Sequence, residues 1–445
     1  MRKHFDFGME SFGGHNYGEI SMEEEAVMNA EAAEAANGAD SDLQEAERII
    51  QMSDSLEDLA VIADGIEEAT PTEVALIENA GDMAVAGTDV PAEEVVPAME
   101  GYVGRRIATE GIRETAKAIW DSILRFLKKV WEKIEAFFYK IFGGIPNLRR
   151  SIASLKKQAD DASGKKTEVK KITINSGIKA LTIDGKQQKT EPEFKSMLGD
   201  LTAASKTVFT THMDETASLG EKIATAIADF DPAEAEKHAT ALYDIVKRST
   251  PKGITGSVNT TRFPGFNTTI GGALAGDVSL CVKRFSDKVD DNTLGKLDRA
   301  RRAGSELIST SEKSTKTLPN DYEMSPLSVG GVRTLMEDAD KILDILEEYK
   351  RGKRSKDIVK TQKSIESASA KATKAMESAN KADAKDSDGN ESSERASVPY
   401  YRGMLNFNAS YARWVQSPAM PLMSSVLTTI RATVVVCQKS LAGYK

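Results

Sequence analysis

Cysteine is scarce in this chain, and long apolar runs are absent. The two cysteines, Cys281 and Cys437, lie far apart and outside any CxxC motif, so we expect a reducing compartment rather than a disulfide framework. Residues 1–19 carry positive charges with no apolar segment after them, so no secretory signal is expected. A membrane span needs about 20 mostly apolar residues. Because no such run occurs, we expect no transmembrane segment.

Motifs for catalysis and metal binding are also missing. The chain has no HExxH motif, no GxSxG motif and no GKS or GKT sequence. Its four histidines have no neighbouring cysteine pair, which argues against a zinc site; they are His4, His15, His212 and His238. The sequence therefore predicts a protein that is not an enzyme and holds no metal or cofactor. An enzyme with an unrecognised helical fold stays open, and a deep pocket with converging carboxylates would favour it.

Basic residues are nearly absent from the first 100 positions. This segment holds 25 acidic residues against Arg2, Lys3 and Arg48, a net charge of −22. Since the whole chain carries −9, the remaining 345 residues carry +13. An acidic segment joined to a basic body is typical of a tail or pro-segment beside a surface that meets polyanions.

The composition predicts a mostly α fold. Aromatic content is 6%, and Ala, Glu, Lys and Ser are abundant, which favours helices. We expect a helical bundle body with one small β-hairpin insertion, preceded by a largely disordered acidic N-terminal segment. The expected parts are an acidic segment (1–110), a basic amphipathic helix (111–150), a helical region (151–249) with a hairpin near 167–186, a Gly/Thr-rich loop or small lobe (250–290), a second helical region (291–382), a disordered linker (383–396) and a C-terminal helical segment (397–445).

The clearest periodicity lies in residues 111–142. Apolar residues recur there at steps of three and four, as on one face of an α-helix, and Gly143, Gly144 and Pro146 are expected to end it. The predicted interaction face consists of Ile119, Trp120, Ile123, Phe126, Leu127, Val130, Trp131, Ile134, Phe137, Phe138 and Ile141. Such a helix can cover its own core, dock into a partner or lie on a membrane, and periodicity alone leaves these roles open.

Weaker patterns predict the other elements. Alternation in residues 172–174 and 181–183 predicts a β-hairpin. Helices are expected over 193–229, from Pro232 to Lys247, over 293–316, over 332–350, and from the basic cluster at 350–356 to Lys381. A turn is expected at Pro418–Pro421. Residues 422–436 are rich in apolar and β-branched residues, so a buried helix and a strand both stay open.

Two similar tripeptides stand where the charge changes sign. Ala98-Met99-Glu100 precedes Gly101, and Ala108-Thr109-Glu110 precedes Gly111, just after a stretch of linker composition at residues 81–97. Exposed linkers are where proteases cut. We therefore predict proteolytic processing at Ala98, Glu100 and Gly101, or at Ala108, Glu110 and Gly111.

This layout resembles the internal head proteins of giant tailed phages of the phiKZ type. The resemblance rests on Ala98, Glu100, Ala108 and Glu110 and on the Trp- and Lys-rich helix that follows. It implies an N-terminal propeptide cut by the phage prohead protease. It further implies a mature part inside the capsid with the DNA and with other capsid or inner-head proteins, and passage through the host cytoplasm during assembly or after ejection.

Two further hypotheses concern charge. Lys and Arg side chains displace counterions from nucleic acid without reading bases; the candidate polyanion contacts are Arg125, Lys128, Lys129, Lys133, Lys350, Arg351, Lys353 and Arg354. The alternative to a head protein is a membrane-surface-active protein, without a transmembrane span, whose helix 111–142 is masked by the acidic segment.

Overall fold

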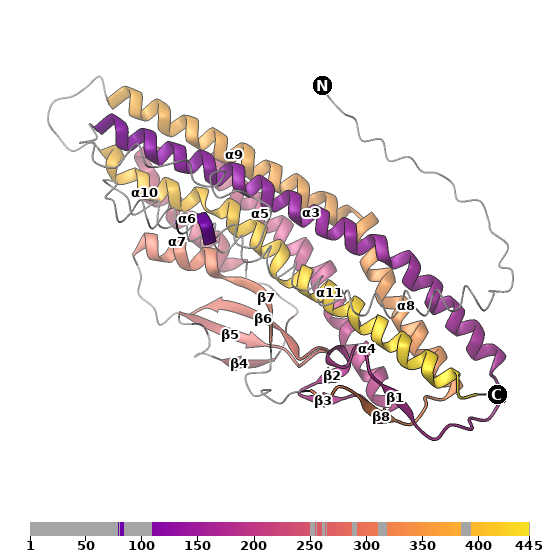
Figure 1. Ribbon diagram of the computed structural model, residues 1–445. Coiled ribbons are helices and arrows are strands. Elements are labelled where there is room, and N and C mark those ends of the chain that lie inside the picture. The colour runs from indigo at the N-terminus through magenta and orange to yellow at the C-terminus, as the bar shows by residue number, and fades with distance from the viewer. Residues whose placement is uncertain are drawn as a thin grey trace, which may run out of the picture.

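The computed structural model describes residues 79, 81–83, 109–249, 254, 256–259, 263, 265–286, 292–309, 318–383 and 393–444. Within residues 109–127 the backbone alone is described. The predicted mostly α fold is confirmed, since long helices form most of this part of the chain (Figure 1). The acidic segment up to residue 108 lies outside the described residues, apart from residues 79 and 81–83.

Long helices run side by side in an elongated bundle (Figure 1). They are α3 (Thr109–Asp161), α8 (Val329–Arg351), α9 (Lys353–Asp383) and α11 (Phe407–Leu441). Shorter helices fill one flank: α4 (Glu191–Lys206), α5 (Met213–Ala228), α6 (Ala235–Arg248), α7 (Thr293–Arg302) and α10 (Ser393–Leu405). A π-helical turn, η4 (Thr207–His212), joins α4 to α5. Single 3-10 turns lie at η3 (Lys179–Leu181) and η5 (Pro232–Glu234).

Helix α11 is the centre of the bundle. It contacts α3, α4, α5, α8 and α9 as well as the sheet, and nearly all of its side chains are buried. Buried hydroxyls of this helix bond to backbone carbonyls, as where Thr429 donates to the carbonyls of Ala180 (3.2 Å) and Ser425 (2.9 Å). The apolar run at 422–436 is therefore a core helix.

The predicted turn at Pro418–Pro421 is wrong, because both prolines lie inside α11. A proline in a helix interior loses a backbone hydrogen bond and costs about 3 kcal/mol. Burial of the surrounding residues offsets this cost, since Leu422, Met423 and Val426 are fully buried.

One stretch of the described chain, Pro399–Leu441, is long and apolar enough to cross a membrane by length and composition. Its most apolar window is 83% buried inside the protein. Core helices of bundles share this combination of length and hydropathy.

The predicted end of the amphipathic helix at Gly143–Pro146 is also wrong, because α3 continues to Asp161. Its apolar face continues through Ile145, Leu148, Ile152 and Leu155, which are buried. Arg149 then fixes the helix to α8 through Asp344 (2.6 Å), Asp340 (3.2 Å) and Glu347 (3.4 Å). Packing against α8 and α11 therefore outweighs the helix-breaking residues.

The two strands predicted to form a hairpin both exist, but they do not pair with each other. Strand β1 (Ile172–Ile174) pairs antiparallel with β8 (Tyr322–Met324), far along the chain. Strand β2 (Thr182–Ile183) pairs instead with β3 (Lys186–Gln187). Asp184 and Gly185 link β2 to β3 with positive φ angles of 52° and 71°, as a tight Asp-Gly hairpin turn requires.

The region predicted as a loop or small lobe contains an antiparallel sheet of four strands. In order these are β4 (Ser257–Asn259), β5 (Phe266–Ile270), β6 (Val278–Phe285) and β7 (Gly304–Ser309). The sheet lies against the lower side of the bundle in Figure 1, where β7 contacts α11.

The helix predicted over 293–316 is wrong beyond Arg302, where α7 ends and β7 follows. Gly304 has a φ of +133°, which side chains rarely adopt. The Trp414 indole donates to the Ala303 carbonyl at 2.6 Å and thereby fixes this corner.

At the predicted linker 383–396, α9 reaches Asp383 and α10 begins at Ser393, while residues 384–392 lie outside the described chain.

Candidate interaction surface of helix α3

The described half of the predicted interaction face is mostly core. Five side chains are buried: Val130, Trp131, Ile134, Phe137 and Ile141. Phe138 is partly buried and contacts the ring of Tyr349 on α8 at 5.9 Å between centroids. The other five predicted positions, Ile119, Trp120, Ile123, Phe126 and Leu127, lie where the structure describes the backbone alone.

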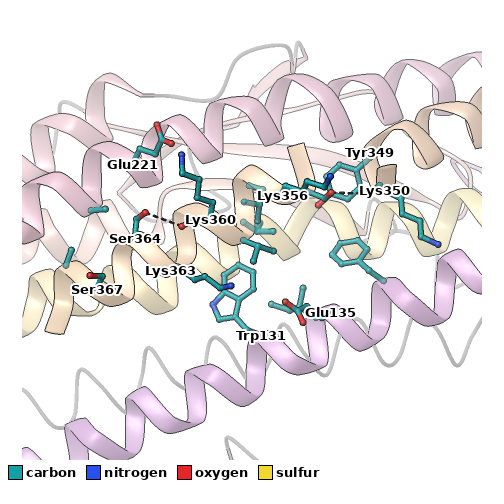
Figure 2. A pocket seen from close by; sticks show the side chains of 18 of the residues that line it. Trp131, Glu135, Glu221, Tyr349, Lys350, Lys356, Lys360, Lys363, Ser364 and Ser367 are labelled. Atoms are coloured by element: carbon teal, nitrogen blue, oxygen red, sulfur yellow. Dashed lines mark hydrogen bonds between the residues drawn. The ribbon is translucent and has the colours of Figure 1, made fainter. Parts of the chain in front are cut away.

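Beside this buried face, α3 borders a large open groove (Figure 2). Its volume is about 1340 Å³, and it is lined by residues of α3, α5, α8 and α9 and by Val415 of α11. Trp131, Ile134, Phe138 and Phe142 line the α3 side. Local sequence patterns could not reveal this groove because its walls come from segments spread over more than 200 positions of the chain.

Carboxylates do not converge in the groove. It is lined by Glu135 from α3 and Glu221 from α5, which lie on opposite sides in Figure 2. Among the residues that the structure describes, no cluster of three or more His, Cys, Asp or Glu could hold a metal ion. The part of the chain that the structure describes therefore gives no pocket with converging carboxylates, the feature that would favour an enzyme.

Most candidate polyanion contacts are engaged within the protein. Arg351 pairs with Glu347 (3.5 Å), Lys353 with Asp357 (3.9 Å) and Arg354 with Asp214 (2.9 Å). The Lys350 ammonium lies 5.2 Å from the centroid of the Phe142 ring. Lys129 and Lys133 also have interaction partners, Lys128 is exposed, and the Arg125 side chain is not described. Most of the described side chains among these residues therefore also interact with groups of the protein itself.

The predicted processing positions fall at the border of the described chain. Ala98, Glu100, Gly101 and Ala108 lie outside the described residues. Glu110 and Gly111 lie in the first turn of α3, which begins at Thr109.

The buried residue His212 ends the π-helical turn η4. Turns of this kind often mark functional positions. His212 borders a cavity of about 30 Å³ together with Glu215, Lys283 and Trp414. Its Nε2 is 2.9 Å from the Trp414 carbonyl oxygen, which can only accept, so Nε2 carries the proton. Its Nδ1 is buried without a hydrogen-bond partner. Burial lowers the pKa of His212, against the opposing effects of the Trp414 carbonyl and of Glu215.

Acidification is therefore expected to destabilise the protein through His212. The neutral imidazole is favoured in the folded state, so the stabilisation is present above the ordinary histidine pKa of about 6.5 and is lost as the pH falls below it. Urea unfolding at pH 7.5 and 5.5 would measure this. The drop in midpoint should shrink in His212→Gln and persist in His238→Gln; an equal drop in both variants would contradict the assignment.

Comparison with known families now adds to this geometry. A family model described as phiKZ-like phage internal head proteins matches residues 23–439, from within the acidic segment to near the end of α11. Neither the comparison with curated proteins nor that with solved structures finds a match. The family match covers nearly the whole chain and gives it a structural role in the interior of the virion head. The chain therefore belongs to the family of phiKZ-like phage internal head proteins.

Proposed function

We propose that this chain is a non-enzymatic head protein that is made with an acidic pro-segment and matured by the phage prohead protease. The observation that carries the proposal is the sign change in charge at two small–x–Glu–Gly sequences, one before α3 and one at its first turn. Removal of residues 1–100 takes away a charge of −22 and leaves a body of +13. Self-repulsion and attraction to acidic partners both rise with such a change.

Cleavage after Glu100 is favoured over cleavage after Glu110. Proteases cut locally unfolded chain, and the Glu110–Gly111 bond lies within the first turn of α3. The Glu100–Gly101 bond precedes the start of that helix by eight residues. Cutting there leaves α3 whole, so its packing on α8 and α11 is preserved.

Substitution of the glutamates tests this proposal. We expect Glu100→Gln, introduced into the phage genome, to leave an unprocessed chain or shift cleavage to Glu110 in purified particles, and Glu110→Gln to leave cleavage unchanged. Intact-mass spectrometry of the packaged protein reads the result. Glu93→Gln, in the same stretch but outside either tripeptide, is the matched control. Unchanged cleavage in Glu100→Gln would contradict the assignment.

Inside the particle, the proposed function includes contacts with other proteins and with DNA. The packaged protein contacts other capsid or inner-head proteins and touches DNA without sequence specificity through exposed side chains such as Lys128. The ion pairs of Arg351 with Glu347 and of Arg354 with Asp214 compete with such contact. Passage through the host cytoplasm precedes packaging and follows ejection.

The membrane-surface alternative is less favoured. It requires the apolar face of α3 to be available to lipid, whereas Trp131, Ile134 and Phe137 are buried. Membrane contact by this face would first need α3 to separate from α8 and α11, which it packs against.

A further inference from the structure

The groove beside α3 has an apolar floor that nothing in the described chain covers. Phe138 and Phe142 of α3, Ala224 of α5, Ile358 of α9 and Val415 of α11 contribute to it. Figure 2 shows the Trp131 ring directed toward this space from α3. The groove therefore offers apolar area to an occupant.

Lysines of α9 line one wall of the groove. Lys356, Lys360, Lys363 and Lys371 occur there, at spacings that keep them along one side of the helix. The α3 wall contributes Glu135 instead. The groove therefore fits an amphipathic helix with carboxylates along one side of its apolar face.

The acidic segment contains such a sequence. Within residues 49–66, apolar residues recur at steps of three and four: Ile49, Met52, Leu56, Leu59, Ala63 and Ile66. Helical geometry places Glu57 and Asp64 on one side of that face and Arg48 on the other. Glu57 and Asp64 are two helical turns apart, as are Lys356 and Lys363, while Arg48 is suited to Glu135.

Length and connection permit this docking. Residues 49–66 would form a helix of about 27 Å, against about 24 Å of α9 between Ser355 and Lys371. The stretch from 67 to 108 can span well over 100 Å when extended, whereas Trp131 lies about 33 Å along α3 from Thr109. A tethered segment also acts at a high effective concentration.

We propose that residues 49–66 occupy the groove between α3, α5 and α9 as an acidic amphipathic helix. The occupied groove covers the apolar surface during assembly. Docking of residues 49–66 does not depend on the proposed processing, whereas their release from the groove does. Cleavage after Glu100 removes the covalent connection and opens the groove to other proteins of the head.

Zero-length carbodiimide cross-linking of the full chain tests the proposal. We expect mass spectrometry to find Glu57 or Asp64 joined to Lys356, Lys360 or Lys363. The double variant Leu56→Asp/Leu59→Asp should lose at least nine-tenths of these cross-links. The matched control is Leu76→Asp/Ile77→Asp, which adds the same two carboxylates in the same acidic segment outside residues 49–66, and it should keep them.

Mixing isotope-labelled and unlabelled chains separates docking in one molecule from docking between copies. Cross-links within one isotope class support the proposal. Mixed cross-links would overturn it in favour of exchange between two copies, and absence of groove cross-links in the wild-type chain would overturn it outright. An unprocessed N-terminus in native particles would refute the proposed maturation without changing the cross-linking pattern, so the two failures can be told apart.

Discussion

Phe137→Asp is expected to destabilise the folded protein by about 4 kcal/mol or more. Phe137 is fully buried in α3, and its ring packs edge-on against Phe138 at 5.9 Å between centroids. Loss of a buried phenylalanine costs about 3–5 kcal/mol, and an uncompensated buried carboxylate adds to that cost. Urea unfolding followed by circular dichroism would show a lower midpoint or no folded baseline.

The matched control lies two residues along the same helix. Tyr139 is 79% exposed, so Tyr139→Asp should change the unfolding free energy by less than about 0.5 kcal/mol. A folded Phe137→Asp protein that has lost binding to anionic vesicles would contradict the core assignment and favour the membrane-surface alternative.

Gly220→Leu is expected to cost about 3 kcal/mol, the second large effect. Gly220 lies where α5 packs closely on α9 and α11, and a Cβ there would stand 2.5 Å from both Thr361 Cγ2 and Tyr411 Cε2. A larger side chain must push the helices apart, and overpacking of this kind costs about 1–3 kcal/mol or more. Thermal and urea unfolding of the purified variant would measure the loss.

Ser218→Leu is the control for this substitution. Ser218 lies on the exposed side of the same helix, so the identical new side chain should be tolerated there. Equal stability of the two leucine variants would show that α5 does not approach α9 and α11 as closely as the structure has it.

Helical periodicity located α3 well but could not find its end. The steps that predicted the face are local properties of the sequence, and Val130, Trp131, Ile134, Phe137 and Ile141 are indeed buried. Whether a helix passes through a proline depends on partners elsewhere in the chain. Pro146, like Pro418 and Pro421, lies inside a helix because contacts with distant helices outweigh the local cost.

Local sequence patterns could predict neither the pairing of the strands nor the groove. The Ile172–Ile174 strand was recognisable by alternation, yet its partner Tyr322–Met324 lies about 150 positions away, so the nearer strand was wrongly chosen. The Gly- and Thr-rich region gave no alternation strong enough to predict its sheet. Likewise no local pattern places the lysines of α9 in the same groove as Trp131, because only the fold brings them together.

The most direct test of the central claim is the N-terminus of this protein in native particles. The head should be purified, the protein digested, and its first peptide identified by mass spectrometry. A chain that begins at Gly101 is the predicted result and establishes a pro-segment removed during head maturation. A chain that begins at Met1 in mature particles would contradict the account and make the acidic segment a permanent part of the packaged protein.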